Sequence, residues 1–72
     1  MITSLSLQAI ASAGGSVVVS AADFTAISLK AIASAGKANG AELIVKDANK
    51  LTSLNCKSIA SANPGHVTFD FT

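Results

Sequence analysis

The chain has 72 residues, of which 50% are hydrophobic and 12% are charged, and its formal net charge is +1. A chain this short forms one small domain whose core is marginal by itself, since folding buries only about 60% of the unfolded surface. The near-neutral charge excludes a nucleic-acid protein held by phosphate contacts. The single cysteine, Cys56, excludes an internal disulfide, and with the single histidine, His66, it cannot alone form a structural zinc site. We therefore expect no metal or cofactor.

The first positive charge of the chain is Lys30, although the preceding residues are apolar and small. A secretion signal needs a positively charged start, and a membrane span needs about 18 or more consecutive apolar residues. Neither feature is present. The sequence therefore predicts a cytoplasmic protein with no membrane partner.

One phrase recurs along the chain, as IASAG at 10–14, IASAG again at 32–36 and IASAN at 59–63. The match continues upstream of each phrase, and a turn and a strand-like run follow it. Self-similarity of this kind is typical of proteins built from stacked structural units. We therefore predict one domain of three repeats, at about 2–21, 24–47 and 51–71.

The first repeat opens with ITSLSLQAIASA at 2–13, which is predicted to be a helix because Ala, Leu and Gln favour helix. Thr3 can cap its start, and Gly14 can end it in a left-handed conformation. On a helical wheel, one broad face is shared by Leu5, Ala9, Ala13, Ile2 and Ile10, with Leu7 at its edge. We expect this face to be buried, with the Ile of each IASA phrase anchoring its helix.

The run that follows, SVVVSA at 16–21, is predicted to be a half-buried strand because its side chains alternate. One face of this strand carries Val17, Val19 and Ala21. The other face carries Ser16, Val18 and Ser20.

The second repeat follows the same plan. FTAISLKAIASA at 24–35 predicts a helix that Thr25 caps and Gly36 ends. The turn GKANG lacks the spacing of a phosphate-binding loop, so it is read as a tight turn in which Asn39-Gly40 supplies positive φ. The strand AELIVK at 41–46 places Ala41, Leu43 and Val45 on one face and Glu42, Ile44 and Lys46 on the other.

The third repeat opens with LTSLNCKSIASA at 51–62, a predicted helix that Thr52 caps and Asn63 ends. Pro64 follows as a stop signal. The last strand, HVTFDF at 66–71, places Val67, Phe69 and Phe71 on one face and His66, Thr68 and Asp70 on the other.

Helices and strands thus alternate three times, which implies parallel pairing with right-handed crossovers. The predicted fold class is α/β, with three α-β repeats that form a small parallel three-stranded sheet. Consecutive crossovers of one hand put all three helices on one face of the sheet, which gives a solenoid-like stack with one bare face.

This layout resembles the short form of the leucine-rich repeat. The first strand carries the resemblance, because Val17-x-Val19-x-x-Ala22-x-Phe24 follows the pattern L-x-L-x-x-N-x-L. Ala22 stands at the Asn position. The second strand, Leu43-x-Val45-x-x-Ala48, departs from the pattern in placing Leu51 one position late. The resemblance implies a sheet whose open face binds other proteins.

Few residues are arranged for chemistry, and we expect no enzyme. The acidic residues Asp23, Glu42, Asp47 and Asp70 lie in different segments, without the spacing of a hydrolytic or metal site. Cys56 stands where the other two repeats have leucine, so it is read as a packed thiol. A nucleophilic cysteine would need His66 as a base close by.

Two surfaces are instead predicted to make contacts. The bare sheet face is the candidate interaction face, with Ser16, Val18, Ser20, Glu42, Ile44, Lys46, His66, Thr68 and Asp70. The two outer strands are predicted to be open edges, with Val17, Val19, Val67, Phe69 and Phe71. Natural sheets usually protect such edges, and no capping segment for either end is recognised in the sequence.

Three functions compete on these grounds. The first is a self-assembling scaffold whose repeats stack head to tail, with the protein itself as partner in an oligomer or filament. The second is a small regulator, chaperone or immunity-type module that binds another protein on the bare face. The third is a small hydrolase that uses Cys56 or His66. The low charge and the open edges favour the first.

Overall fold

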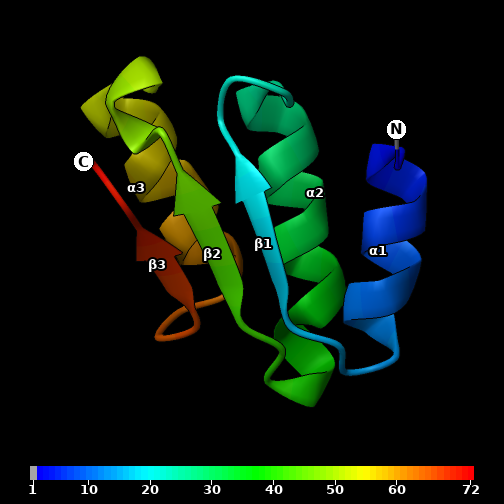
Figure 1. The fold of residues 1–72 in the computed structure, drawn as a ribbon. Coiled ribbons are helices and arrows are strands. Elements are labelled where there is room, and N and C mark those ends of the chain that lie inside the picture. Colours follow the sequence, from blue (N-terminus) through cyan, green and yellow to red (C-terminus); the bar gives the residue numbers. More distant parts are fainter. Residues whose placement is uncertain (1) are drawn as a thin grey trace.

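The computed structural model describes residues 2–72 as a small mixed α/β protein (Figure 1). The helices are α1 (Ser4–Ser12), α2 (Ala26–Gly36) and α3 (Ser53–Ala62), and the strands are β1 (Val17–Ser20), β2 (Leu43–Lys46) and β3 (Val67–Phe69). Two short 3-10 turns, η1 (Lys37–Asn39) and η2 (Ala48–Lys50), flank β2. The predicted order of three helices alternating with three strands is confirmed.

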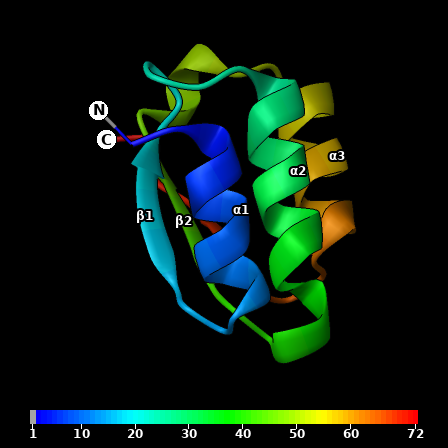
Figure 2. The ribbon, with the colours of Figure 1, turned by 90° about the vertical axis from the view of Figure 1, so that its right-hand side faces the viewer.

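The three strands form one parallel sheet in the order β1-β2-β3. Val18 lies opposite Ile44, and Ile44 lies opposite Thr68. The three helices form one layer against one face of the sheet (Figure 2). The predicted parallel sheet is therefore confirmed, and its other face carries no helix from residues 2–72.

Each helix begins at the threonine that the sequence indicates. The hydroxyl oxygens of Thr3, Thr25 and Thr52 accept hydrogen bonds from the backbone N–H three residues later, at Ser6, Ser28 and Asn55. These bonds satisfy N–H groups that the first turn of a helix leaves free. The three predicted caps are confirmed.

The predicted helix ends are right at only one position. Gly14 has a φ of 94°, but Gly36 has a φ of −85° and Asn63 a φ of −149°, so neither is left-handed. A Cβ at Gly36 would lie 3.0 Å from the Cβ of Ala41, so this glycine serves close packing. The positive φ of the second turn lies at Gly40 (66°), as predicted, but not at Asn39, which belongs to the 3-10 turn η1.

The predicted buried face of the helices is right in part. Ile32 and Ile59, predicted to anchor their helices, are each 1% exposed. Three leucine and isoleucine residues expected on that face, Leu5, Ile27 and Leu54, are instead 75%, 83% and 73% exposed. Leu7 and Leu29, placed at the edge of that face, are buried in the core. In α1 and α2 the small residue that follows the isoleucine, Ala11 or Ala33, is buried in the core instead.

The core lies between the helix layer and the sheet. Its largest fully buried side chains are Leu29, Ile32, Leu43, Ile59 and Val45. The strands contribute the alternate residues that the sequence indicates, since Val19, Leu43 and Val45 are buried while Val18 and Lys46 are exposed.

Candidate functional site

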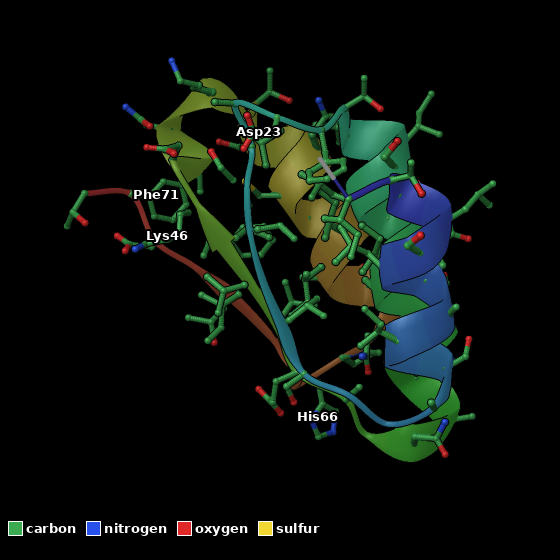
Figure 3. All side chains as sticks on the ribbon, turned by 45° about the vertical axis from the view of Figure 1, so that its right-hand side comes forward. Asp23, Lys46, His66 and Phe71 are labelled. Atoms are coloured by element: carbon green, nitrogen blue, oxygen red, sulfur yellow. The ribbon has the colours of Figure 1, made fainter. Side chains whose placement is uncertain are left out.

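The predicted interaction face is ordered by the strand register into three rows across the sheet. The middle row is Val18, Ile44 and Thr68, and Ser20 lies opposite Lys46 in the row at the carboxyl ends of the strands. His66 lies at the other end of the sheet, away from Lys46 and Asp23 (Figure 3). The register thus places Val18, Ser20, Ile44, Lys46 and Thr68 on the open sheet face. The alternation of the strands extends this face to the flanking residues Ser16, Glu42, His66 and Asp70.

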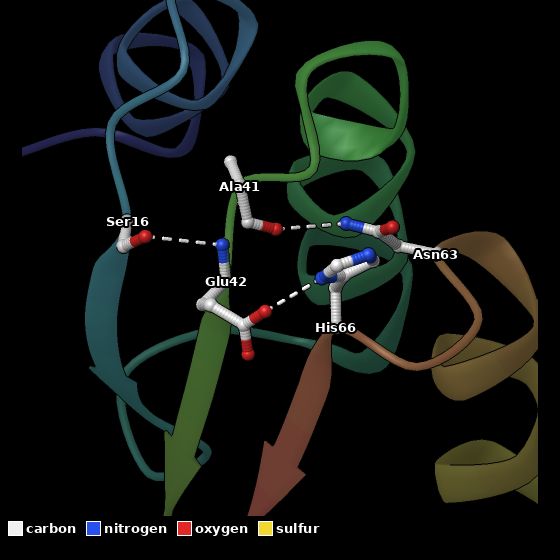
Figure 4. A network of polar contacts seen from close by, with 5 residues as sticks. All are labelled: Ser16, Ala41, Glu42, Asn63 and His66. Atoms are coloured by element: carbon white, nitrogen blue, oxygen red, sulfur yellow. Dashed lines mark hydrogen bonds and ion pairs between the residues drawn. The ribbon is translucent and has the colours of Figure 1, made fainter.

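The row at the amino ends of the strands holds a small polar network (Figure 4). His66 Nδ1 lies 2.6 Å from Glu42 Oε2, and the backbone N–H of Glu42 donates to Ser16 Oγ at 3.1 Å. The side chains of His66 and Glu42 are 42% and 46% exposed. An exposed pair of this kind contributes only about 0–1 kcal/mol, so it orients side chains more than it stabilises the fold.

The row at the carboxyl ends includes a contact that the sequence did not indicate. Ser20 Oγ donates to Asp47 Oδ2 at 2.6 Å, and Asp47 has a left-handed φ of 55°. Aspartate tolerates this conformation better than most residues, which is the one sequence signal that a turn begins there. The bond joins the last residue of β1 to the turn after β2.

Asp70, in the same row, is held by the chain that follows it. The hydroxyl and the backbone N–H of Thr72 both donate to Asp70 Oδ1. These two hydrogen bonds lower the pKa of the Asp70 carboxyl below its ordinary value, with the charge of Lys46 as a smaller cause. The carboxylate therefore remains charged at neutral pH.

The centre of the open face is apolar. Val18 is 60% exposed and Ile44 is partly exposed beside it, while Thr68 completes the row. Charged and hydroxyl side chains flank this row at both ends of the strands. The result is a small apolar strip between polar rims.

Both outer strands present free backbone groups within residues 2–72. The N–H groups of Val17 and Ala21 donate to the carbonyl oxygens of Glu42 and Lys46. Because N–H groups alternate between the two edges of a strand, Val18 and Ser20 direct theirs away from the sheet. A row of free donors and acceptors of this kind is a template for another strand.

The predicted edge side chains differ in their exposure. Val19 is buried in the core, Val17, Val67 and Phe69 are partly buried, and Phe71 is 59% exposed. The rings of Phe69 and Phe71 stack with their centroids 6.3 Å apart. β3 and the residues after it therefore carry two stacked phenylalanines that the core of the protein covers only in part.

A groove of about 330 Å³ runs beside the open edge of β1. Its apolar wall is formed by Ile2, Leu7, Val19 and Phe24, and its rim includes Asp23 and Lys46. Leu7, Val19 and Phe24 also belong to the hydrophobic core or pack against it. Leu7 and Val19 are 5% and 7% exposed and Ile2 is 49% exposed, so the groove lies at the margin of the core.

The isoleucines of the three IASA phrases differ in how well neighbouring helices cover them. Ile32 and Ile59 are each 1% exposed, whereas Ile10 is 40% exposed. α2 packs beside α1, and α3 packs beside α2, but no helix of residues 2–72 precedes α1. A position that is covered in the second and third copies is therefore uncovered in the first.

The opposite end shows the complementary difference. Leu7 and Leu29 are buried, but Cys56, which occupies the same position in the third copy, is only partly buried. Ala60 is partly exposed where Ala11 and Ala33 are buried. No helix of residues 2–72 lies beyond α3 to cover these side chains.

The structure does not bring Cys56 and His66 together as a nucleophile and its base. Cys56 lies in the first half of α3, whereas His66 follows α3 and contacts Glu42. Among residues 2–72, no group of three His, Cys, Asp or Glu side chains is placed to hold a metal ion.

Comparisons with known proteins found no family model, no curated protein and no solved structure that matches the chain. None of the helices in residues 2–72 has the length and apolar character that crossing a membrane requires.

Proposed function

We propose that the protein is a non-catalytic scaffold of three solenoid-like repeats whose copies assemble head to tail. The carrying observation is the exposure of Ile10, at 40%, against 1% at the matched Ile32 and Ile59. The end of α3 and β3 in one copy would cover the end of α1 and β1 in the next. The new contact would thus reproduce the contacts between neighbouring units of a single chain.

The parallel sheet supports an open assembly in place of a two-fold dimer. One end of the sheet is β1 with α1, and the other end is β3 with α3, so the two ends are different surfaces. A contact between different surfaces is heterologous, and it produces a ring or a filament.

The charge distribution supports the same contact. Neither α1 nor β1 carries a charged residue, and residues 2–22 contain none. Strand edges that avoid pairing usually carry charges, most often lysine. The β1 strand itself lacks this protection, and the charges near it, Asp23 and Lys46, lie at the rim of the groove.

The proposal predicts that a charge at Ile10 prevents assembly. We expect the unmodified protein to sediment as increasingly heavy species with rising concentration, and Ile10→Lys to remain a monomer. A lysine at the contact would have to bury its charge without a partner. Sedimentation velocity across a concentration series measures the difference.

The matched control is Ile27→Lys, which changes the same residue type at a position that is 83% exposed on the outer face of α2. This variant should assemble like the unmodified protein, and circular dichroism should show that both variants fold. A monomer for the unmodified protein at the highest concentration would refute the proposal.

A second candidate function is favoured by the apolar strip of the open sheet face. Val18 is 60% exposed and lies opposite Ile44 in the middle of a polar surface, which suits a contact with another protein.

If this face binds a partner, Val18→Glu with Ile44→Glu should abolish capture of that partner by affinity purification. Ile44→Glu alone should leave head-to-tail assembly intact, because Ile44 lies in the central strand β2, whereas Val18 lies in the edge strand β1. A partner that stays bound to the double variant would exclude this face.

A further inference from the structure

We infer the register of the contact between copies: β3 of one copy pairs in parallel with β1 of the next, with Thr68 opposite Val18. Phe69 and Phe71 then occupy the groove beside β1. This inference rests on the proposed head-to-tail assembly and specifies its partner surface, which is the β1 edge of a second copy.

The free backbone N–H and C=O groups on the outer edges of β3 and β1 alternate in a way that lets the two edges pair. On β3, the Asp70 N–H donates to the Val45 oxygen and the His66 oxygen accepts from Leu43, so Val67 and Phe69 direct their groups to the free edge. On β1, Val18 and Ser20 direct theirs outward by the same alternation.

The contact between β1 and β2 inside the chain shows which residues a further strand pair would join. The N–H of Val17 donates to the oxygen of Glu42, which precedes its register partner Leu43. Val17, Leu43 and Val67 are register partners across the sheet, so Val17 of the next copy is taken as the next partner of Val67. The rule then pairs the N–H of Val67 with the oxygen of Ser16 in that copy. It places Thr68 opposite Val18. A shift by one residue would turn the apolar face of β3 to solvent.

The side chains on the helix side of the sheet fit the same register. Val19, Val45 and Phe69 lie in one row across the sheet, so Phe69 would lie beside Val19 of the next copy. Val19 lines the groove together with Leu7 and Phe24. Phe71, which is 59% exposed, stacks on Phe69 and would reach the same apolar wall.

The register can be tested with paired cysteines on the open face, in a Cys56→Ala background. The first variant carries Val18→Cys and Thr68→Cys, and the control carries Val18→Cys and Asp70→Cys. Within one chain β2 separates these positions by roughly 9–10 Å, which exceeds the reach of a disulfide of about 7 Å. Any disulfide therefore joins two copies.

We expect mild oxidation to convert the first variant into a ladder of covalent oligomers on a non-reducing gel. The control should remain at least about tenfold less cross-linked, since its cysteines would lie roughly 8 Å apart in the proposed register. Equal cross-linking of the two variants, or more in the control, would overturn the register.

A second measurement uses the unmodified chain and needs no redesign. Cys56 is partly buried at the α3 end, and the next copy would cover it. We expect its alkylation rate, with reagent in excess, to fall by about threefold or more between dilute and assembled protein, because exposure controls thiol reactivity.

The outcomes separate this inference from the proposed function. If the protein assembles in sedimentation but the first variant forms no ladder and Cys56 stays reactive, the register is wrong and another surface makes the assembly. If the protein remains a monomer at every concentration, both proposals fail.

Discussion

Leu29→Ala is expected to destabilise the protein by about 2–5 kcal/mol, because it opens a cavity at the centre of the core. Leu29 is fully buried in α2, with the sheet on one side and a helix on each flank. In a domain of 72 residues such a loss approaches the whole stability of the fold. Urea denaturation followed by circular dichroism measures the change in the free energy of unfolding.

Ile27→Ala is the control on the same helix. It removes a large aliphatic side chain that is 83% exposed, so the expected change is within about 0.5 kcal/mol. A helical wheel of the sequence predicts the reverse order. If Ile27→Ala were the more damaging variant, the assignment of the buried helix face would be wrong.

Asn63→Ala is expected to cost about 1–3 kcal/mol, because it leaves a buried carbonyl group without its donor. Asn63 is 1% exposed, and its side-chain amide donates to the backbone oxygen of Ala41 at 3.0 Å (Figure 4). This bond connects the residue that ends α3 to the segment that precedes β2. Thermal or urea unfolding of the variant measures the loss.

Asn39→Ala provides the comparison, since Asn39 also donates its amide to a backbone oxygen, that of Ser12. Asn39 is exposed, so water replaces the lost bond and the expected change is within about 0.5 kcal/mol. Equal losses for the two variants would show that burial does not strengthen the Asn63 contact.

The open sheet face was predictable from the strands alone. A strand turns successive side chains to opposite faces, so Val18, Ile44 and Thr68 had to share one face once the strands were placed. Their order across the sheet follows from parallel pairing in sequence. The Ser20–Asp47 bond was not predictable, because it joins the end of β1 to a left-handed aspartate 27 residues away.

The local signals of the sequence determined the three helices, the three strands and the parallel sheet. Thr3, Thr25 and Thr52 cap their helices through bonds to residues three positions later, so each cap depends only on neighbouring sequence. The alternation of strands and helices then left parallel pairing as the favoured topology.

Only the tertiary structure decided which face of each helix is buried and what Asn63 does. A helical wheel gives the apolar residues of one helix, but the direction of the core is set by the neighbouring helices and by the sheet. In α1, the small Ala11 faces that core while the larger Leu5 faces solvent. Asn63 likewise bonds a residue 22 positions away, and contacts over such distances in sequence arise from packing and leave no local pattern.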